Sequence, residues 1–163
     1  MSQGWEKELM AGELSTARIS REFDFPRESV FDMFTDSRKA AKWWGPEGST
    51  NLAFELDPRP GGALVIHDRN SEGAIFKTLG TIVEIVIPEL LVFRTTTTSQ
   101  DGAAPFEAMQ RVTFEALTPK RTRVTALVRV LAVGSWPGDA DSLKEAFKGG
   151  WTETLQRLQE AMS

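Results

Sequence analysis

The feature that most constrains the fold is one long amphipathic segment, which follows a series of alternating segments. Between residues 139 and 162, apolar side chains recur at steps of three and four: Leu143, Phe147, Trp151, Leu155, Leu158 and Met162. This spacing predicts a helix of about six turns with one apolar stripe. A sheet built from the preceding segments needs a cover for its apolar face, and this stripe is the only long one available. We therefore predict a sheet packed against this helix.

Most of the chain before this helix alternates between apolar and polar residues, which is the period of a β-strand. The first such segment is 16–25, and in the second, 50–56, one face is predicted to hold Thr50, Leu52, Phe54 and Leu56. A third strand is predicted around Leu64 and Ile66. Turn residues then separate four more predicted strands, which cover residues 75–87, 90–98, 107–117 and 121–133.

Two short helices are predicted between the first two strands. Pro26 suits the first turn of a helix, and three apolar residues follow it at helical spacing. Asp36 or Ser37 can cap a second short helix. This second helix is expected to end at residues 43–44, two Trp, because Gly-Pro follows at residues 45–46.

The predicted packing also locates a candidate site. A strongly curved sheet wrapped round one helix leaves a gap between the two layers, and we predict that this gap binds a ligand. Gly149 and Gly150 lie inside the predicted helix. Each costs roughly 1 kcal/mol relative to Ala, so we expect close packing or a kink at this point.

The composition restricts the chemistry of that site. The chain has no Cys, no Tyr and one His, beside five Trp and ten Phe. The absence of Cys excludes a thiolate nucleophile, a disulfide and a Cys–zinc site. One His cannot make a multi-histidine metal site, and without Tyr there is no phenolic acid or base. We therefore expect no metal and no cofactor, and a site lined mainly by apolar side chains.

Length and charge indicate one domain without a nucleic-acid or membrane partner. At about 100–200 residues per domain, the 163 residues predict one domain over 16–163 after an N-terminal extension over 1–15. The net charge of −4 and the dispersed basic residues argue against nucleic acid. No apolar run approaches the ~20 residues of a membrane helix, so a cytoplasmic location is expected. A homodimer through the outer sheet face or Trp5 stays open.

Five stretches in sequence order resemble a known family: REFDFPRESVFDMFTDSRKAAKWWGP (21–46), ELDPRPGG (55–62), GTIVEIVIPELLVFR (80–94), TRVTALVRVL (122–131) and GGWTETLQRLQEAM (149–162). Together they resemble the family named for the activator of the heat-shock-protein-90 ATPase, within the START-like (SRPBCC) superfamily. The resemblance implies an α+β helix-grip fold. In this fold a curved seven-stranded antiparallel sheet, with two short helices after its first strand, wraps around a long C-terminal helix and a deep apolar cavity.

The predicted ligand-binding residues are large rings and cavity-facing strand residues, together with four polar groups that would orient the ligand. They are Trp43, Trp44, Phe54, Leu64, Ile66, Asp68, Phe76, Thr78, Phe93, Thr95, Gln110, Trp136, Phe147 and Trp151. Many relatives have Trp where this chain has Thr95, which implies a larger or more polar cavity near that position. Trp136, in a Gly/Pro-rich loop before the long helix, is predicted either to line an entrance or to join the core.

Three polar residues are candidates for catalysis. The parity of His67 opposes the apolar residues of its strand, which predicts the outer face of the sheet. Asp68 has cavity parity, and desolvation would raise its pKa and make it a candidate acid or base, although a residue at a strand end commonly stays hydrated. Glu84 is predicted to point outward and pair with Arg94 or Arg129; the alternative is a buried carboxylate that orients a ligand. We assign no catalytic residue.

Three functions are compatible with these residues. We expect a binding protein for a small apolar or amphipathic ligand, whose affinity comes from apolar burial at about 25 cal/mol per Å². The first alternative is a cyclase- or hydrolase-like enzyme that uses a cavity carboxylate, but the predicted lining lacks His, Tyr and Cys. The second alternative is a regulator of a chaperone ATPase. For that task the eukaryotic activator carries further domain sequence, for which we expect no room in this chain.

Overall fold

The computed structural model describes residues 16–99 and 105–163. The predicted N-terminal extension, 1–15, lies outside these residues, as does most of the loop predicted between Ser99 and Pro105. The described elements are β1 (Thr16–Phe23), α2 (Arg27–Thr35), α3 (Ser37–Ala40), β2 (Thr50–Leu56), β3 (Ala63–Arg69), β4 (Ile75–Val86), β5 (Leu90–Ser99), β6 (Phe106–Thr118), β7 (Arg121–Ala132) and α4 (Ala140–Met162).

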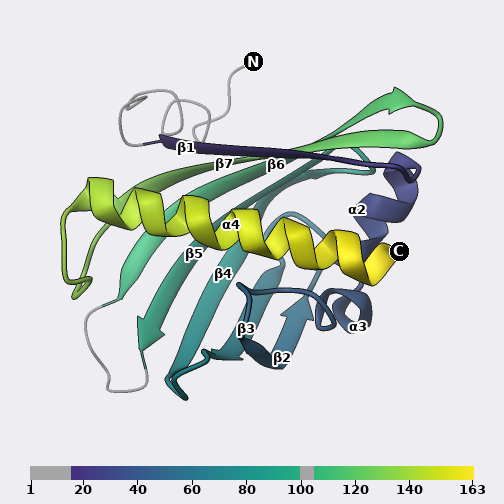
Figure 1. The fold of residues 1–163 in the computed structure, drawn as a ribbon. Helices are drawn as coiled ribbons and strands as arrows, with labels where there is room; N and C mark the ends of the chain where they lie inside the picture. The colour runs from purple at the N-terminus through teal and green to yellow at the C-terminus, as the bar shows by residue number, and fades with distance from the viewer. Residues whose placement is uncertain (1–15, 100–104) are drawn as a thin grey trace.

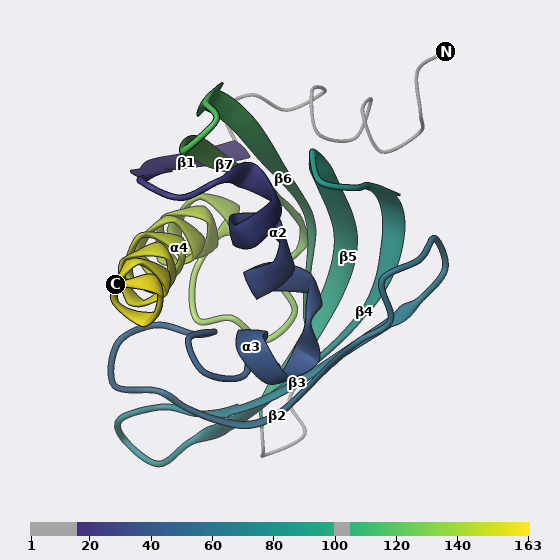
Figure 2. The ribbon, with the colours of Figure 1, turned by 90° about the vertical axis from the view of Figure 1, so that its right-hand side faces the viewer.

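The seven strands form one antiparallel sheet in the order β1-β7-β6-β5-β4-β3-β2. From β2 to β7 each strand pairs with its sequence neighbour, whereas β1 pairs with β7, with Thr16 opposite Arg129. The sheet is strongly curved, and α4 runs across its concave side (Figure 1). Seen from the end, the short helices α2 and α3 lie across one end of the space between the sheet and α4 (Figure 2). This arrangement confirms the predicted helix-grip fold.

The two short helices begin largely as their sequences predict. Pro26 occupies the N-cap position of α2, whose buried residues are the three predicted apolar ones. The Asp36 carboxylate caps α3, because it accepts hydrogen bonds from the backbone N–H groups of Arg38 and Lys39. However, α3 ends at Ala40, earlier than predicted. The chain then continues as a turn in which the Trp44 N–H donates to the Ala40 carbonyl at 3.0 Å.

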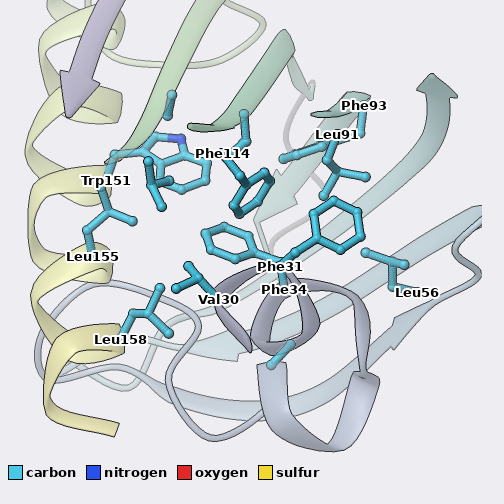
Figure 3. Close-up of a cluster of buried hydrophobic side chains, with 14 of the residues drawn as sticks. Val30, Phe31, Phe34, Leu56, Leu91, Phe93, Phe114, Trp151, Leu155 and Leu158 are labelled. Carbon is cyan, nitrogen blue, oxygen red and sulfur yellow. The ribbon is translucent and has the colours of Figure 1, made fainter. Parts of the chain in front are cut away.

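The hydrophobic core is densest at the end of the sheet that α2 and α3 cover. Phe34 of α2 packs edge-on against Phe114 of β6 and Trp43, at ring-centroid distances of 5.0 and 4.7 Å. Phe31 packs edge-on against the same Phe114 at 5.0 Å. Figure 3 shows these Phe side chains between the ribbon of α2 and the strands, with Trp151 approaching from α4. Rings from three layers therefore fill this end.

A β-bulge in β2 overturns one predicted face. The register between β2 and β3 shifts between Asn51 and Ala53, so Asn51 lies opposite Asp68 and Phe54 lies opposite Ile66. Leu52 does not share the buried face of Phe54 as alternation predicts, and it is 44% exposed. A bulge adds one residue to one strand and reverses the side-chain parity beyond it.

Helix α4 is 23 residues long and is capped by Asp139, whose carboxylate accepts a hydrogen bond from the Ser142 N–H. The helix continues through Gly149 and Gly150. A Cβ added at either glycine meets nothing within 4 Å, so the prediction of close packing there is wrong. In the part of the chain that the structure describes, no helix combines the length and the apolar character needed to cross a membrane.

Candidate functional site

A cavity of about 370 Å³ lies between the concave face of the sheet and α4. This volume falls within the range of about 300–1,000 Å³ that small-molecule sites occupy. The sheet contributes residues of β3, β4, β5 and β6, and α4 contributes residues from Leu143 to Thr154. The loop after α3 adds Trp44, Gly45, Pro46 and Ser49, and the loop before α4 adds Trp136.

The sheet side of the cavity is built from residues directly opposite one another on neighbouring strands. Near the turn that joins β3 to β4, Asp68 of β3 lies opposite Phe76 of β4, and we call this the outer level. One level further in, Thr78 of β4 is flanked by Ile66 of β3 and Thr97 of β5. Each level is two residues from the next along a strand, because alternate side chains point to the same face. The antiparallel register therefore brings five lining residues from three strands onto one wall.

The two ends of the cavity differ in exposure. We call the end lined by Phe93, Thr95, Gln110 and Trp151 the inner end; all four side chains are buried. We call the end lined by Asp68, Phe76, Phe106, Trp136 and Phe147 the outer end; all five are half-buried. Solvent therefore reaches the outer end and not the inner one.

Three rings stand together at the outer end. Phe106 packs edge-on against Trp136 at a centroid distance of 6.2 Å and against Phe147 at 5.9 Å. The indole N–H of Trp136 donates to the Ser142 hydroxyl at 2.8 Å, which ties the loop to the first turn of α4. Trp136 thus lies at the half-buried end of the cavity rather than in the core.

A chain of buried hydrogen bonds crosses the inner end. The Trp151 indole Nε1–H of α4 donates to Gln110 Oε1 of β6 at 2.8 Å. Gln110 Nε2 in turn donates to Thr95 Oγ1 of β5 at 3.1 Å. The side chains are only 5%, 6% and 3% exposed, in that order. Three elements that are distant in sequence are therefore joined by polar groups in an otherwise apolar wall.

Asp68 is the only charged side chain among the described residues that line the cavity. Burial raises the pKa of its carboxyl group above the ordinary 3.8. Three smaller effects oppose this shift: a hydrogen bond from Asn51 Nδ2 at 3.0 Å, the charge of Arg157 and the charge of His67. The carboxyl group is thus held in a partly desolvated place, with no ion pair to another described residue within 4.0 Å.

Arg157 of α4 fixes the loop that forms one side of the cavity. Its Nη1 group donates to the carbonyl oxygens of Gly45 and Pro46 at 3.0 and 2.9 Å, and to Ser49 Oγ at 2.9 Å. Gly45 has a φ of 108°, a conformation that favours glycine. The loop from 45 to 49 is therefore anchored to the helix through one guanidinium group.

The structure places most of the predicted site residues together on the cavity lining. These are Trp44, Ile66, Asp68, Phe76, Thr78, Phe93, Thr95, Gln110, Trp136, Phe147 and Trp151. Three others belong to the core and not to the lining: Trp43, Phe54 and Leu64. The Trp43 ring packs beside that of Trp44, at a centroid distance of 5.4 Å, but its indole N–H donates to the Met33 carbonyl at 3.0 Å and the side chain is fully buried.

Other lining residues were not predicted: Gly45, Pro46, Ser49, Asn70, Thr97, Phe106, Leu143, Ala146, Gly150 and Thr154. Several of them carry a signal that could have identified them. Thr97 is two residues from Thr95 on the same strand face, and Phe106 lies opposite Thr97 across β5 and β6. Gly150 and Thr154 lie one helical turn apart on α4, on the face that holds Phe147 and Trp151. The loop residues carry no such periodicity.

Two of the three polar candidates for catalysis lie outside the cavity lining. His67 lies between Ala53 and Lys77 in the sheet and is not on the lining. Glu84 lies opposite Val92, beyond a register shift, and is absent from the lining as well. Within residues 16–99 and 105–163, no group of three or more His, Cys, Asp or Glu residues could hold a metal ion.

Comparisons with known proteins agree with this fold. A protein from Silicibacter pomeroyi, titled AHSA1, has 26% sequence identity and a TM-score of 0.75, over 90% of this chain and 96% of that one. A protein from Chromobacterium violaceum has 25% identity and a TM-score of 0.71, over 90% and 95% of the two chains. An Arthrobacter aurescens protein, at 22% identity and a TM-score of 0.74 over 91% and 86%, shows the shared fold.

The search of the curated proteins gave no match. The family described as "Activator of Hsp90 ATPase homolog 1-like protein" matches residues 24–163, which is nearly the whole helix-grip domain. The chain therefore belongs to this family.

Proposed function

We propose that the protein binds a small, largely apolar ligand in the cavity between the sheet and α4. The observation that carries this proposal is the cavity itself: about 370 Å³ of space in a domain whose other end is filled by rings from three layers. Protein interiors are normally packed without voids of this size, so an empty interior costs contacts that a ligand restores.

The helix side of the cavity supports the proposal. Ala146 and Gly150 are the smallest residues on the stripe of α4 that faces the sheet. Glycine inside a helix costs about 1 kcal/mol relative to alanine, and nothing lies within 4 Å of the place where the Gly150 Cβ would be. Unlike Gly149, Gly150 lies on the lining, so the side chain that it lacks leaves space inside the cavity.

The experiment compares two neighbouring glycines of α4. Gly150 lines the cavity, whereas Gly149 is exposed and does not. The variant Gly150→Leu fills the cavity, and Gly149→Leu adds the same side chain to the solvent side. Native mass spectrometry of the purified proteins and titration with the neutral fluorescent probe N-phenyl-1-naphthylamine measure occupancy. We expect wild type and Gly149→Leu to bind and Gly150→Leu to lose at least tenfold in affinity.

Two results would contradict the proposal. One is the absence of any co-purified molecule together with no binding of the probe and no thermal shift from a library of apolar compounds. The other is equal probe binding by Gly150→Leu and Gly149→Leu with unchanged folding by circular dichroism, since the probe would then occupy another surface.

A further inference from the structure

The hydrogen bonds at the inner end have a fixed direction. An indole N–H is a donor and never an acceptor, so the atom of Gln110 that faces Trp151 Nε1 at 2.8 Å must be the carbonyl oxygen. The amide nitrogen then faces Thr95 Oγ1 at 3.1 Å, and the threonine oxygen must accept. The indole N–H of Trp151 thus fixes the orientation of the Gln110 amide. The Gln110 N–H in turn makes the Thr95 hydroxyl oxygen an acceptor.

This direction leaves donors unused at the inner end. Thr95 Oγ1 makes no other side-chain hydrogen bond within the described residues, so its own proton is free to point elsewhere. Gln110 Nε2 carries a second N–H that likewise has no acceptor among them. Both side chains line the cavity and are almost completely buried. A buried donor without an acceptor is unfavourable, so the inner end favours a ligand atom that accepts.

The outer end has the opposite character. An ionised carboxylate only accepts hydrogen bonds, and Asp68 receives one side-chain bond, from Asn51. The nearest described cation that affects it electrostatically from α4 is Arg157, whose Nη1 group is already bonded to three oxygen atoms of the 45–49 loop. Aromatic rings of Phe76 and Phe106 line the same end, and ring faces attract cations.

The two ends are separated along the strands. Asp68 and Leu64 are four residues apart on β3, and Leu64 lies in register with Gly80, which lies opposite Thr95. At a rise of about 3.3 Å per residue, these two levels are about 13 Å apart along the strand direction. The wall between them carries Ile66 and the pair formed by Thr78 and Thr97, whose hydroxyl oxygens are 3.0 Å apart.

Resting on the proposed function, we propose that the cavity binds an elongated amphipathic amine in one orientation, with a hydrogen-bond-accepting oxygen at Thr95 and the ammonium group at Asp68. The apolar middle of the molecule lies against Ile66, which stands on the level between those of Asp68 and Leu64. A ligand of the reverse polarity places an acceptor against the Asp68 carboxylate and leaves the inner donors without a partner.

The test uses five compounds built on one eight-carbon chain: octane, octylamine, 2-octanone, octanoate and 8-amino-2-octanone. Their affinities are measured by displacement of N-phenyl-1-naphthylamine at neutral pH. One net hydrogen bond corresponds to roughly a three- to tenfold change in affinity. We expect 8-amino-2-octanone to bind more tightly than either octylamine or 2-octanone, each by roughly that factor. Octanoate should bind more weakly than octane.

Variants assign each preference to its residue. Thr95→Val removes the Thr95 hydroxyl, one of the two inner donors, and should weaken 2-octanone but not octylamine, whereas Thr95→Ser keeps the hydroxyl and should behave as wild type. Asp68→Asn should weaken octylamine but not 2-octanone. Thr96→Val, on the outer face of the same strand, is the matched control and should change neither. Because Thr95→Val also takes the acceptor from Gln110, the ¹³C shift of the bound ketone carbonyl in wild type provides a second, independent readout.

The results separate the two proposals. If wild type binds neither the fluorescent probe nor any compound of the apolar library and carries no co-purified molecule, the proposed function fails. If the probe binds but the amine, the ketone and octane compete equally well, binding stands and the orientation is overturned. The orientation is also overturned if octanoate is the tightest of the five, because the charge of Arg157 would then outweigh that of Asp68, or if Thr95→Val and Asp68→Asn change no preference.

Discussion

The two ends of the concave face both carry aromatic side chains, but one end is a packed core and the other is a cavity. At one end Phe31 and Phe34 pack onto Phe114 in a continuous core (Figure 3), and Trp43 packs onto Phe34. At the other end Phe76, Phe106 and Phe147 stand around a cavity and remain half-buried. The difference lies in what covers the sheet: α2 and α3 add a third layer at the first end (Figure 2), and α4 presents Ala146 and Gly150 near the second.

This comparison shows that aromatic content alone does not distinguish a core from a binding site. A ring becomes core when another layer supplies a partner of matching size, and it becomes a cavity wall when the facing residues are small. The two ends should therefore respond differently to the loss of a ring, to the loss of an anchor and to the filling of space.

The largest expected contrast comes from removing one ring at each end. Phe34→Ala opens a void in the packed end and should lower the free energy of unfolding by about 3–5 kcal/mol. Phe106→Ala enlarges an existing cavity and should cost about 1 kcal/mol or less. Urea unfolding followed by circular dichroism measures both. Equal losses would show that the outer end is packed as tightly as the core.

An intermediate effect is expected from the anchor of the 45–49 loop. Arg157→Met removes three hydrogen bonds from one guanidinium group and should cost about 1–2 kcal/mol, less than a fully buried charged group would, because Arg157 is half-buried. Lys148→Met, on an exposed position of the same helix, is the control and should be neutral. If both variants unfold at the same urea concentration as wild type, the loop does not depend on this contact.

A smaller effect is expected from the two glycines of α4. Gly149→Ala and Gly150→Ala should each stabilise the protein by up to about 1 kcal/mol through helix propensity. Only Gly150→Ala should also weaken the binding of N-phenyl-1-naphthylamine, because its methyl group enters the cavity. Thermal unfolding and probe titration on the same samples give both quantities. Weaker binding by Gly149→Ala would mean that the effect is not steric.

The smallest expected effect concerns pH. Burial raises the pKa of Asp68 above 3.8, so between 3.8 and the raised value the folded protein binds more protons than the unfolded chain. The contribution of Asp68 to the free energy of unfolding therefore decreases as pH rises through this window. Asp68→Asn should remove that decrease and be slightly more stable than wild type at neutral pH. A curve for Asp68→Asn that is parallel to that of wild type would contradict the assignment.

The same group predicts how ligand affinity depends on pH. Octylamine should bind less tightly as the pH falls through the raised pKa of Asp68, because a protonated carboxyl group no longer attracts the ammonium group. Three neighbours of the carboxyl group bear on this titration: Asn51, Arg157 and His67. Affinity for 2-octanone should stay constant over the same pH range. In Asp68→Asn the affinity for octylamine should also no longer depend on pH there, so the two compounds should show the same pH dependence.

The sequence predicts the sheet and the helix because their apolar periods differ and each extends over many residues. It also identifies most of the cavity wall, since strand parity places Thr78 and Asp68 on one face and helical spacing aligns Phe147 with Trp151. Prediction from the sequence fails where a local irregularity of the backbone determines the direction of a side chain. The bulge beside Leu52 reverses parity without a sequence signal, and Trp43 and Trp44 are adjacent in a turn whose direction depends on tertiary packing.

The pairing of β1 with β7 has a consequence for how the domain folds. Strands β2 to β7 form a meander in which each strand pairs with its sequence neighbour, whereas β1 pairs with a strand about a hundred residues away. Pairing across such a separation closes a long loop and is slow compared with hairpin formation. Because α4 packs on both β1 and β7, we expect the cavity to form only after this closure. Ligand binding would therefore mark the end of folding. The rate of ligand binding during refolding would follow the rate at which β1 pairs with β7.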